Sequence, residues 1–294
     1  MLAGSASRAA ELLGITQPAV SRAIAELEGT VGFLLFERVR GRLAPTPEAK
    51  LLMLEVDRSF VGLDRVRAEA ARIRDFGSGS IRIASLAALG STLVPHAIRR
   101  FQEKNPDVVL TLQIHSTSAV RNMVANGIFD LGLVADEADL SGLEHRAFGS
   151  FPAVCAIPPD HPLREKTVIG PADLHGQRFV ALAPEDRARR RLDAVLEAAG
   201  SKPKIVVETP NSATICALAL EGVGIGLANP AAADGFAERG LVLRPFEPTV
   251  PFKSFLIFGP DARKTRLVKG FANELMAARQ QPRTNPDLRL LTSR

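Results

Sequence analysis

Apolar residues repeat at helical spacing in two short stretches between Ser7 and Glu28, with a glycine between them. In the second stretch, Val20, Ile24 and Leu27 stand at positions i, i+4 and i+7, so this stripe is expected to face a core. A glycine after an apolar helix end supplies the left-handed residue that often ends a helix. The pattern predicts two short helices joined by a tight turn.

Residues suited to helix starts accompany both stretches. Ser7 and Thr16 are N-cap candidates. The outward side of the second helix is small and polar, which suits a helix that enters the major groove of DNA. The residues on or beside that side are Gln17, Pro18, Ser21 and Arg22. A helical hairpin whose outer face is only solvated is the alternative interpretation.

A basic hairpin is predicted directly after the two helices. Residues 33–43 combine apolar positions with arginines, and the sequence Pro-Thr-Pro at 45–47 ends the segment. Two short strands with arginines at their tip can contact phosphates or lie in the minor groove. The arginines concerned are Arg38, Arg40 and Arg42.

One long helix is predicted over residues 48–76. Gly62 is the only glycine in this segment, proline is absent from it, and apolar residues recur at spacings of three, four and seven. Such a seam favours pairing with a second helix, so dimerisation is preferred over packing into its own domain. The sequence Gly-Ser-Gly-Ser at 77–80 is typical of a hinge.

Strand and helix patterns alternate after the hinge. The expected strands are 81–84, 108–114, 130–134, 153–157, 178–182, 205–208, 224–228, 241–243 and 252–258. The expected helices are 92–104, 118–126, 184–199, 211–221 and 262–278. This alternation predicts an α/β fold in which helices cover both faces of a parallel sheet.

Composition sets wide limits on the protein class. The chain has 294 residues, of which 46% are hydrophobic, enough for a large core and for two or more domains. No apolar run approaches a membrane span and no signal-peptide pattern starts the chain, which predicts a cytosolic protein without a membrane partner. Cys155 and Cys216 are isolated in apolar contexts, which favours buried thiols over a disulfide or metal pair.

The overall charge favours a polyanionic partner but does not locate it. The net charge is +5 and the isoelectric point is near 9.6. The arginines of the first 47 residues are nearly balanced by glutamates. The positions of the arginines, not their number, therefore support the prediction of DNA binding.

The first 47 residues contain a long, ordered and specific pattern of segments: Ala9-Ala10-Glu11-Leu12-Leu13, Thr16-Gln17-Pro18-Ala19-Val20-Ser21-Arg22, Ile24, Leu27-Glu28, Gly32, Leu35-Phe36-Glu37-Arg38 and Leu43-Ala44-Pro45-Thr46. This pattern resembles the DNA-binding part of the LysR-type transcriptional regulators, and the resemblance extends over nearly the whole chain. Residues 38–49 also resemble the subgroup that includes the octopine and nopaline catabolism regulators.

The resemblance implies an α/β protein with an N-terminal, all-α, winged helix-turn-helix, a long linker helix and a two-lobed effector domain similar to periplasmic binding proteins. The implied domains are 1–47 for DNA binding, 48–76 for the linker and dimerisation helix, 77–280 for effector binding and 281–294 as a mobile tail. Lobe I would comprise 80–155 plus 259–280, and lobe II 156–258. Double-stranded promoter DNA, a small-molecule effector, RNA polymerase and further copies of the chain in a dimer or tetramer are the implied partners, with no cofactor.

The start of the chain departs from this family pattern. LysR-type regulators carry a helix before the Gly-Ser that corresponds to Gly4 and Ser5, whereas only residues 1–3 precede it here. Either the true start lies upstream or the winged domain is incomplete, and a truncated or misassigned start is the preferred interpretation.

An effector site is expected where strands end at a cleft between two lobes. Hydroxyl and amide side chains at helix starts can bind a carboxylate, although each is equally suited to be a plain N-cap. The candidates are Ser85, Ala87, Ala88, Ser116, Thr117, Ser118, Ala181, Asn211 and Ser212, together with Asp136 for a cationic group of the ligand. Glu137 is a second acid beside Asp136. The predicted effector is an opine or a basic amino acid.

Other sequence signals have plain structural interpretations. The glycines of residues 222–226 are spaced as in a dinucleotide fingerprint but stand before and within a strand, which favours a tight turn. The arginines of residues 187–191 crowd a helix start and are expected to form a solvated face, with contact to DNA or another subunit as the lesser alternative.

No catalytic constellation is found in the sequence. The five histidines have no HExxH spacing, and neither a Gly-x-Ser-x-Gly elbow nor a P-loop occurs. The sequence therefore predicts a regulator and not an enzyme. A solute-binding protein built from the same two lobes, without a DNA role, is the alternative for residues 80–280.

Overall fold

The computed structural model describes residues 3, 5–39, 42–53, 55–56, 59, 66, 79–260, 262 and 265–279. The chain divides into two compact units, Met1–Arg67 and Ala68–Arg294. Most of the helix predicted over 48–76, the hinge glycine and serine at 77–78, Arg40 and the tail at 281–294 lie outside the described residues.

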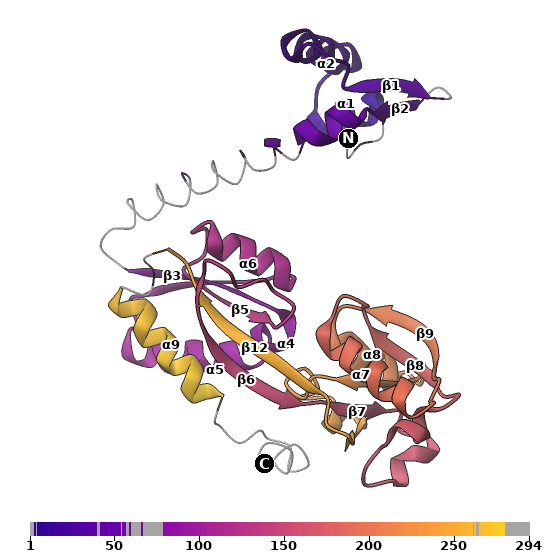
Figure 1. The fold of residues 1–294 in the computed structure, drawn as a ribbon. Helices are drawn as coiled ribbons and strands as arrows, with labels where there is room; N and C mark the ends of the chain where they lie inside the picture. Colours follow the sequence, from indigo (N-terminus) through magenta and orange to yellow (C-terminus); the bar gives the residue numbers. More distant parts are fainter. Residues whose placement is uncertain are drawn as a thin grey trace. The chain divides into compact units, whose positions relative to one another are not determined.

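The first unit contains the predicted pair of helices and the hairpin (Figure 1). Its elements are α1 (Ala6–Leu13), α2 (Gln17–Val31), β1 (Phe36–Val39) and β2 (Arg42–Pro45). Gly14 ends α1 with φ 66°, a left-handed conformation that glycine adopts without steric cost. The strands β1 and β2 pair antiparallel, so the winged helix-turn-helix prediction is confirmed.

Local hydrogen bonds position the helices of this unit, and one cap differs from the prediction. Ser5, not Ser7, is the N-cap of α1, and its hydroxyl accepts from the amide of Arg8 at 3.2 Å. Ser7 lies inside the helix because the chain turns helical two residues earlier than its apolar pattern indicates. The Glu28 carboxylate accepts from the amide of Leu35 at 2.7 Å, which ties α2 to the start of the hairpin.

The apolar stripe of α2 is only partly covered in this unit. Val20 is buried, whereas Leu27, predicted to face inward, is 46% exposed. Leu12, Leu13 and Leu34 are also exposed. The expectation that this stripe faces inward is therefore wrong for Leu27, because the described residues of this unit do not cover that end of the helix.

Lobe I of the second unit is a five-stranded mixed sheet of order β4-β3-β5-β12-β6. Its strands are β3 (Ser80–Ser85), β4 (Val109–Ile114), β5 (Leu131–Ala135), β6 (Glu144–Pro152) and β12 (Pro251–Phe258). Its helices are α4 (Ala87–Gly90), α5 (Leu93–Lys104), α6 (Thr117–Ala125) and α9 (Arg266–Ala278). Helices α5 and α9 lie below the sheet and α6 above it in Figure 1. Phe101 and Phe271 join α5 to α9 edge to face, with ring centroids 5.5 Å apart.

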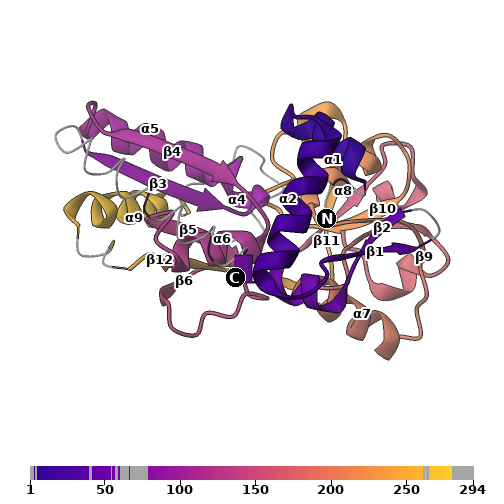
Figure 2. The same cartoon turned by 90° about the horizontal axis from the view of Figure 1, so that it is seen from above.

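Lobe II is a second five-stranded mixed sheet, of order β11-β7-β10-β8-β9. Its strands are β7 (Val154–Ile157), β8 (Arg178–Leu182), β9 (Lys204–Thr209), β10 (Ile225–Ala228) and β11 (Val242–Pro245). Its helices are α7 (Arg187–Ala198) and α8 (Ser212–Leu220), with short 3₁₀ turns at Pro162–Glu165, Pro171–Leu174 and Ala237–Arg239. The two lobes lie side by side in both views (Figure 1, Figure 2).

The sheets and lobe boundaries differ from the prediction in two respects. Only β4-β3-β5 and β9-β8-β10 are parallel, and the remaining pairs are antiparallel. The strand β12 pairs with β5 and β6, so residues 251–258 belong to lobe I and not to lobe II. The chain therefore crosses between lobes near residues 153 and 250. An apolar strand fits the sheet of either lobe equally well, so the sequence pattern of 251–258 could not assign this strand to lobe I.

Candidate functional site

A cavity of about 660 Å³ lies between the two lobes of the second unit. Its walls include the segments that follow β3, β5 and β8, together with the first turns of α6, α7 and α8. Amide groups in the first turn of a helix favour anions, because they have no partner within the helix. The cavity thus combines strand ends and helix starts from both lobes.

Seven of the ten predicted effector residues line this cavity. They are Ala87, Ala88, Ser116, Thr117, Ser118, Asn211 and Ser212. The structure thus brings together residues of lobe I and lobe II that are about a hundred positions apart.

The hydroxyl and amide side chains of the cavity also serve local structure. Ser116 caps α6 and Asn211 caps α8, the latter accepting from the amide of Ala213 at 2.9 Å. The Ser212 hydroxyl accepts from the amide of Asn229 at 3.1 Å. Capping and lining are therefore combined in the same side chains, and the two interpretations of the sequence do not exclude each other.

Two predicted residues lie away from the cavity. Ser85 is fully buried, and its hydroxyl donates to the carbonyl of Leu86 at 3.0 Å. Ala181 is buried within β8. Both belong to central strands, and the residues beyond the strand ends form the wall.

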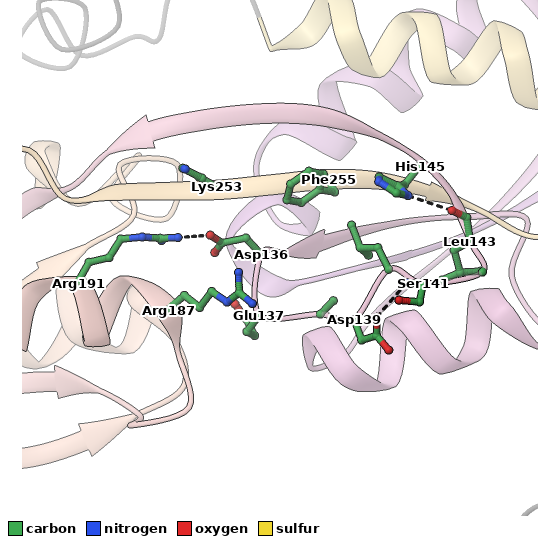
Figure 3. A pocket seen from close by; sticks show the side chains of 13 residues that line it. Asp136, Glu137, Asp139, Ser141, Leu143, His145, Arg187, Arg191, Lys253 and Phe255 are labelled. Carbon is green, nitrogen blue, oxygen red and sulfur yellow. Dashed lines mark hydrogen bonds and ion pairs between the residues drawn. The ribbon is translucent and has the colours of Figure 1, made fainter.

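Asp136 is engaged by the protein itself. Its carboxylate forms an ion pair with Arg191 of α7 and lines a neighbouring cavity of about 830 Å³ instead of the 660 Å³ cavity. Figure 3 shows Arg191 directed at Asp136, with Glu137 beside it. Asp136 is therefore not available to a ligand in the way that the sequence predicted.

The charged residues that do line the 660 Å³ cavity were mostly missed from the sequence. They are Glu137, Glu185, Asp186, Arg190 and Lys253. The available signal was an Asp followed by a helix, because Asp186 caps α7 and accepts from the amides of Ala188 and Arg189. The cavity presents both signs of charge to a ligand.

Burial raises the pKa of two acids that line the cavity from opposite lobes. It raises the pKa of Glu137, and the nearby charge of Asp186 raises it further, whereas a hydrogen bond with Thr117 opposes the shift. Burial likewise raises the pKa of Asp186, against the helix amides that lower it. A carboxylate that is costly to keep charged gains most from a cationic ligand.

The arginines of α7 form the expected solvated face only in part, because Arg187 and Arg190 are exposed whereas Arg189 and Arg191 are engaged by other elements. Arg189 is 8% exposed and donates to the carbonyl of Leu182 at 2.6 Å and to the carboxylate of Glu208 at 2.9 Å. Arg191 pairs with Asp136. These guanidinium groups cross from the helix to neighbouring elements, and the sequence pattern gives no indication of those partners.

The glycines of residues 222–226 support close packing in lobe II. Gly222 has φ 75° in the turn before β10. A side chain at Gly226 would lie 2.2 Å from Ile215 of α8 and 2.8 Å from the carbonyl of Val180. The interpretation as turn and packing glycines is consistent with this geometry.

The predicted DNA-contacting residues of α2 form an exposed surface. Gln17, Pro18, Ser21 and Arg22 are all exposed, and the Gln17 amide donates to the Ser21 hydroxyl at 2.8 Å. Arg38 and Arg42 belong to β1 and β2, in which Arg38 is opposite Leu43 and Arg42 is opposite Val39. The helix and the hairpin thus belong to one compact unit.

Metal-binding clusters and membrane-spanning helices are both absent from the described residues. Among these residues, no group of three or more His, Cys, Asp and Glu side chains is arranged to hold a metal ion. Within the same ranges, no helix has the length and apolar character that crossing a membrane requires.

Comparison with known proteins assigns the family. Residues 1–50 match the family described as bacterial regulatory helix-turn-helix protein, lysR family, and residues 74–280 match the LysR substrate binding domain. The chain belongs to the LysR-type transcriptional regulators. This LysR-type regulator is 37% identical to the transcriptional activator protein LysR of Escherichia coli, over 94% of this chain and 89% of that protein. It is 32% identical to the octopine catabolism/uptake operon regulatory protein OccR of Rhizobium meliloti, over 93% and 91%.

The fold of this LysR-type regulator is also found in solved structures. The crystal structure of CbnR, a LysR family transcriptional regulator, matches with a TM-score of 0.66 at 16% identity, over 94% of each chain. The relatives are transcriptional regulators and not enzymes. The helix-turn-helix match in a chain that also carries the two lobes supports a regulator over a solute-binding protein.

Proposed function

We propose that this LysR-type regulator reads operator DNA with its first unit and responds to a small amphoteric effector held between the lobes of the second. Gln17, Pro18, Ser21 and Arg22 of α2 would contact base edges in the major groove. Arg38, Arg40 and Arg42 of the hairpin would contact phosphates or the minor groove. The exposure of the α2 residues supports this assignment.

Two copies of the chain would pair through the helix predicted over 48–76, as a dimer or as a tetramer of two such pairs. Paired reading helices fit operator half-sites related by a two-fold axis and spaced by whole turns of DNA. A regulator of this kind acts where the operator is, in the cytoplasm, with RNA polymerase as a further partner. The domain boundaries proposed for these roles are 1–47, 48–76 and 77–280.

The cavity between the lobes supports an effector that carries a carboxylate and a cation. The first turns of α6 and α8 favour the carboxylate, with Ser116, Thr117, Ser118, Asn211 and Ser212 at hand. Glu137 and Asp186 favour a cationic group at the same cavity. A volume of about 660 Å³ is within the range of small-molecule sites.

An opine or a basic amino acid has this combination of groups. The relative named for octopine catabolism and uptake supports the choice, because octopine joins a guanidinium and a secondary amine to two carboxylates. The observation that carries the proposal is the presence of both charge signs, from both lobes, at one cavity.

The test is a thermal-shift screen followed by calorimetry with the full-length protein. The chain contains neither Trp nor Tyr, so an added dye must report unfolding. Octopine, arginine and lysine should raise the melting temperature, because a ligand that binds only the folded state stabilises it. Pyruvate and agmatine, which carry only one of the two groups, should not. Equal stabilisation by pyruvate would contradict the role of the acids, and no effect of any amphoteric compound would contradict the effector class.

A further inference from the structure

Arg191 joins α7 of lobe II to two groups of lobe I. One terminal nitrogen pairs with the Asp136 carboxylate, and the other donates to the carbonyl of Pro251 at 2.9 Å. The side chain of Asp136 is 9% exposed and that of Arg191 is 27% exposed. Figure 3 shows the guanidinium extended from the helix toward the carboxylate. A pair this sheltered is screened much less by salt than a surface pair.

Both partners of Arg191 occupy positions that define the junction of the lobes. Asp136 directly follows β5, a central strand of the lobe I sheet. Pro251 is the first residue of β12, where the chain returns from lobe II to lobe I. One guanidinium therefore fixes α7 both to the opposite lobe and to the crossing strand.

The effector cavity is adjacent to each end of this ion pair. Glu137, which lines the cavity, is the next residue after Asp136, and Asp186, which lines it from the other lobe, is the N-cap of the helix that carries Arg191. A change in the spacing of the lobes at the ion pair therefore changes the spacing of the cavity walls. Arg187 and Lys253 line the adjoining 830 Å³ cavity, and Lys253 lines the effector cavity as well.

We propose that Arg191 is a positioning residue of the effector site, whose ion pair with Asp136 holds the two lobes at the separation that the effector requires. The inference rests on the proposed function of the 660 Å³ cavity. Without the ion pair the lobes sample wider separations, and only part of the population has both walls in place. The apparent dissociation constant for an effector then equals the intrinsic constant divided by the fraction of molecules that are competent to bind.

The first test measures the distance between the lobes without any ligand. Spin labels at Gln102→Cys in α5 and Glu197→Cys in α7 occupy exposed positions, whereas Cys155 and Cys216 are buried and should stay unlabelled. Double electron–electron resonance on the full-length parent protein should give a narrow distribution of distances between the two labels. Arg191→Met and Asp136→Asn should both broaden it. The exchanged pair, Asp136→Arg with Arg191→Asp, should narrow it again relative to either single change.

Arg187→Met is the matched control, because it removes the same charge from an exposed residue one turn before Arg191 in α7. It should leave the distribution unchanged. An unchanged distribution in both Arg191→Met and Asp136→Asn would overturn the inference. Broadening of equal size in Arg187→Met would also overturn it, since the effect would then be general to charge on this helix.

The second test measures octopine affinity by calorimetry. Arg191→Met and Asp136→Asn should each raise the dissociation constant about tenfold relative to Arg187→Met, with folding checked by circular dichroism. If octopine does not bind the parent protein, the proposed effector class fails while the distance measurement still decides the role of Arg191. If octopine binds all variants equally, the ion pair does not position the site.

Discussion

Glu137 of lobe I and Asp186 of lobe II line the same cavity, in which burial raises the pKa of Glu137 and the charge of Asp186 raises it further. Each carboxylate has a neighbour that partly stabilises its charge, a hydrogen bond with Thr117 for Glu137 and the first amides of α7 for Asp186. Burial nevertheless dominates both shifts. Keeping both carboxylates charged therefore costs free energy when no cation is bound in the cavity. A ligand that carries a cationic group reduces this cost and is favoured.

The first prediction concerns stability against pH. Between the ordinary pKa of a glutamate and the raised pKa of Glu137, the folded protein keeps a proton that the unfolded chain has released. The free energy of unfolding should therefore fall as pH rises through this window. Asp186 should act in the same direction from its own ordinary pKa upward. Urea unfolding followed by circular dichroism at a series of pH values measures the effect.

Glu137→Gln is the control for the pH effect, since it keeps the shape of the side chain and removes the titration. It should flatten the decline and make the protein more stable than the parent above the raised pKa. Asp186→Asn should do the same while still capping α7. An unchanged slope in both variants would show that other groups cause the decline.

The second prediction concerns the hydroxyl of Thr117. This hydroxyl accepts from the amide of Ala135 at 3.3 Å and interacts with Glu137 at the cavity wall. Thr117→Val removes these bonds and should weaken effector binding about tenfold, which is close to the loss of one hydrogen bond. Calorimetry measures the affinity, and size-exclusion chromatography should show an unchanged oligomer. Thr167→Val, at an exposed position of lobe II, should leave the affinity unaltered.

The order of elements could be predicted from the sequence where an apolar run is bounded by turn residues. The strand expected at 178–182 is β8 without a change of bounds. The strand β6 was missed because Glu144, His145 and Arg146 give its first half a polar pattern, and Gly149 and Pro152 interrupt the second. Edge position in the sheet allows this composition, since one side of the strand lacks a partner strand.

The sequence predicted those parts of the candidate site that depend on residues close together in the chain. Ser116, Thr117 and Asn211 were predicted because each stands where a helix begins after a strand, and all three line the cavity. Asp136 also follows a strand, but its carboxylate forms an ion pair with Arg191, which lies 55 residues later in the chain. Pairing at such a distance depends on how α7 packs, which no local pattern contains.

The third prediction concerns Arg189, the buried guanidinium of α7. It donates to the Leu182 carbonyl and to the carboxylates of Asp193 and Glu208. Arg189→Met should lower the free energy of unfolding by about 2 kcal/mol, because hydrogen bonds with charged groups are lost while both acids can still reach water. Urea denaturation measures the change. Arg187→Met, with the same substitution at an exposed position of the helix, should differ from the parent by less than about 0.5 kcal/mol.

The fourth prediction concerns Arg22 on the exposed side of α2. The probe is a duplex selected from a random pool by the parent protein, and gel shift measures its binding. If Arg22 contacts a base edge, Arg22→Ala should cost about 1–3 kcal/mol, which is a loss of affinity of about fivefold to 150-fold for this duplex. Binding to random DNA should fall much less, because phosphate contacts supply most of that affinity.

Two comparisons make the Arg22 result specific. Arg8→Ala removes the same charge from an exposed position of α1, where Arg8 pairs only loosely with Glu11 at 3.5 Å, and should leave discrimination between the two DNAs intact. Effector affinity should not change in either variant, because the cavity is built entirely from the second unit. Equal losses on selected and random DNA would make Arg22 a phosphate contact. Unchanged binding to the selected duplex would remove α2 as the reading helix.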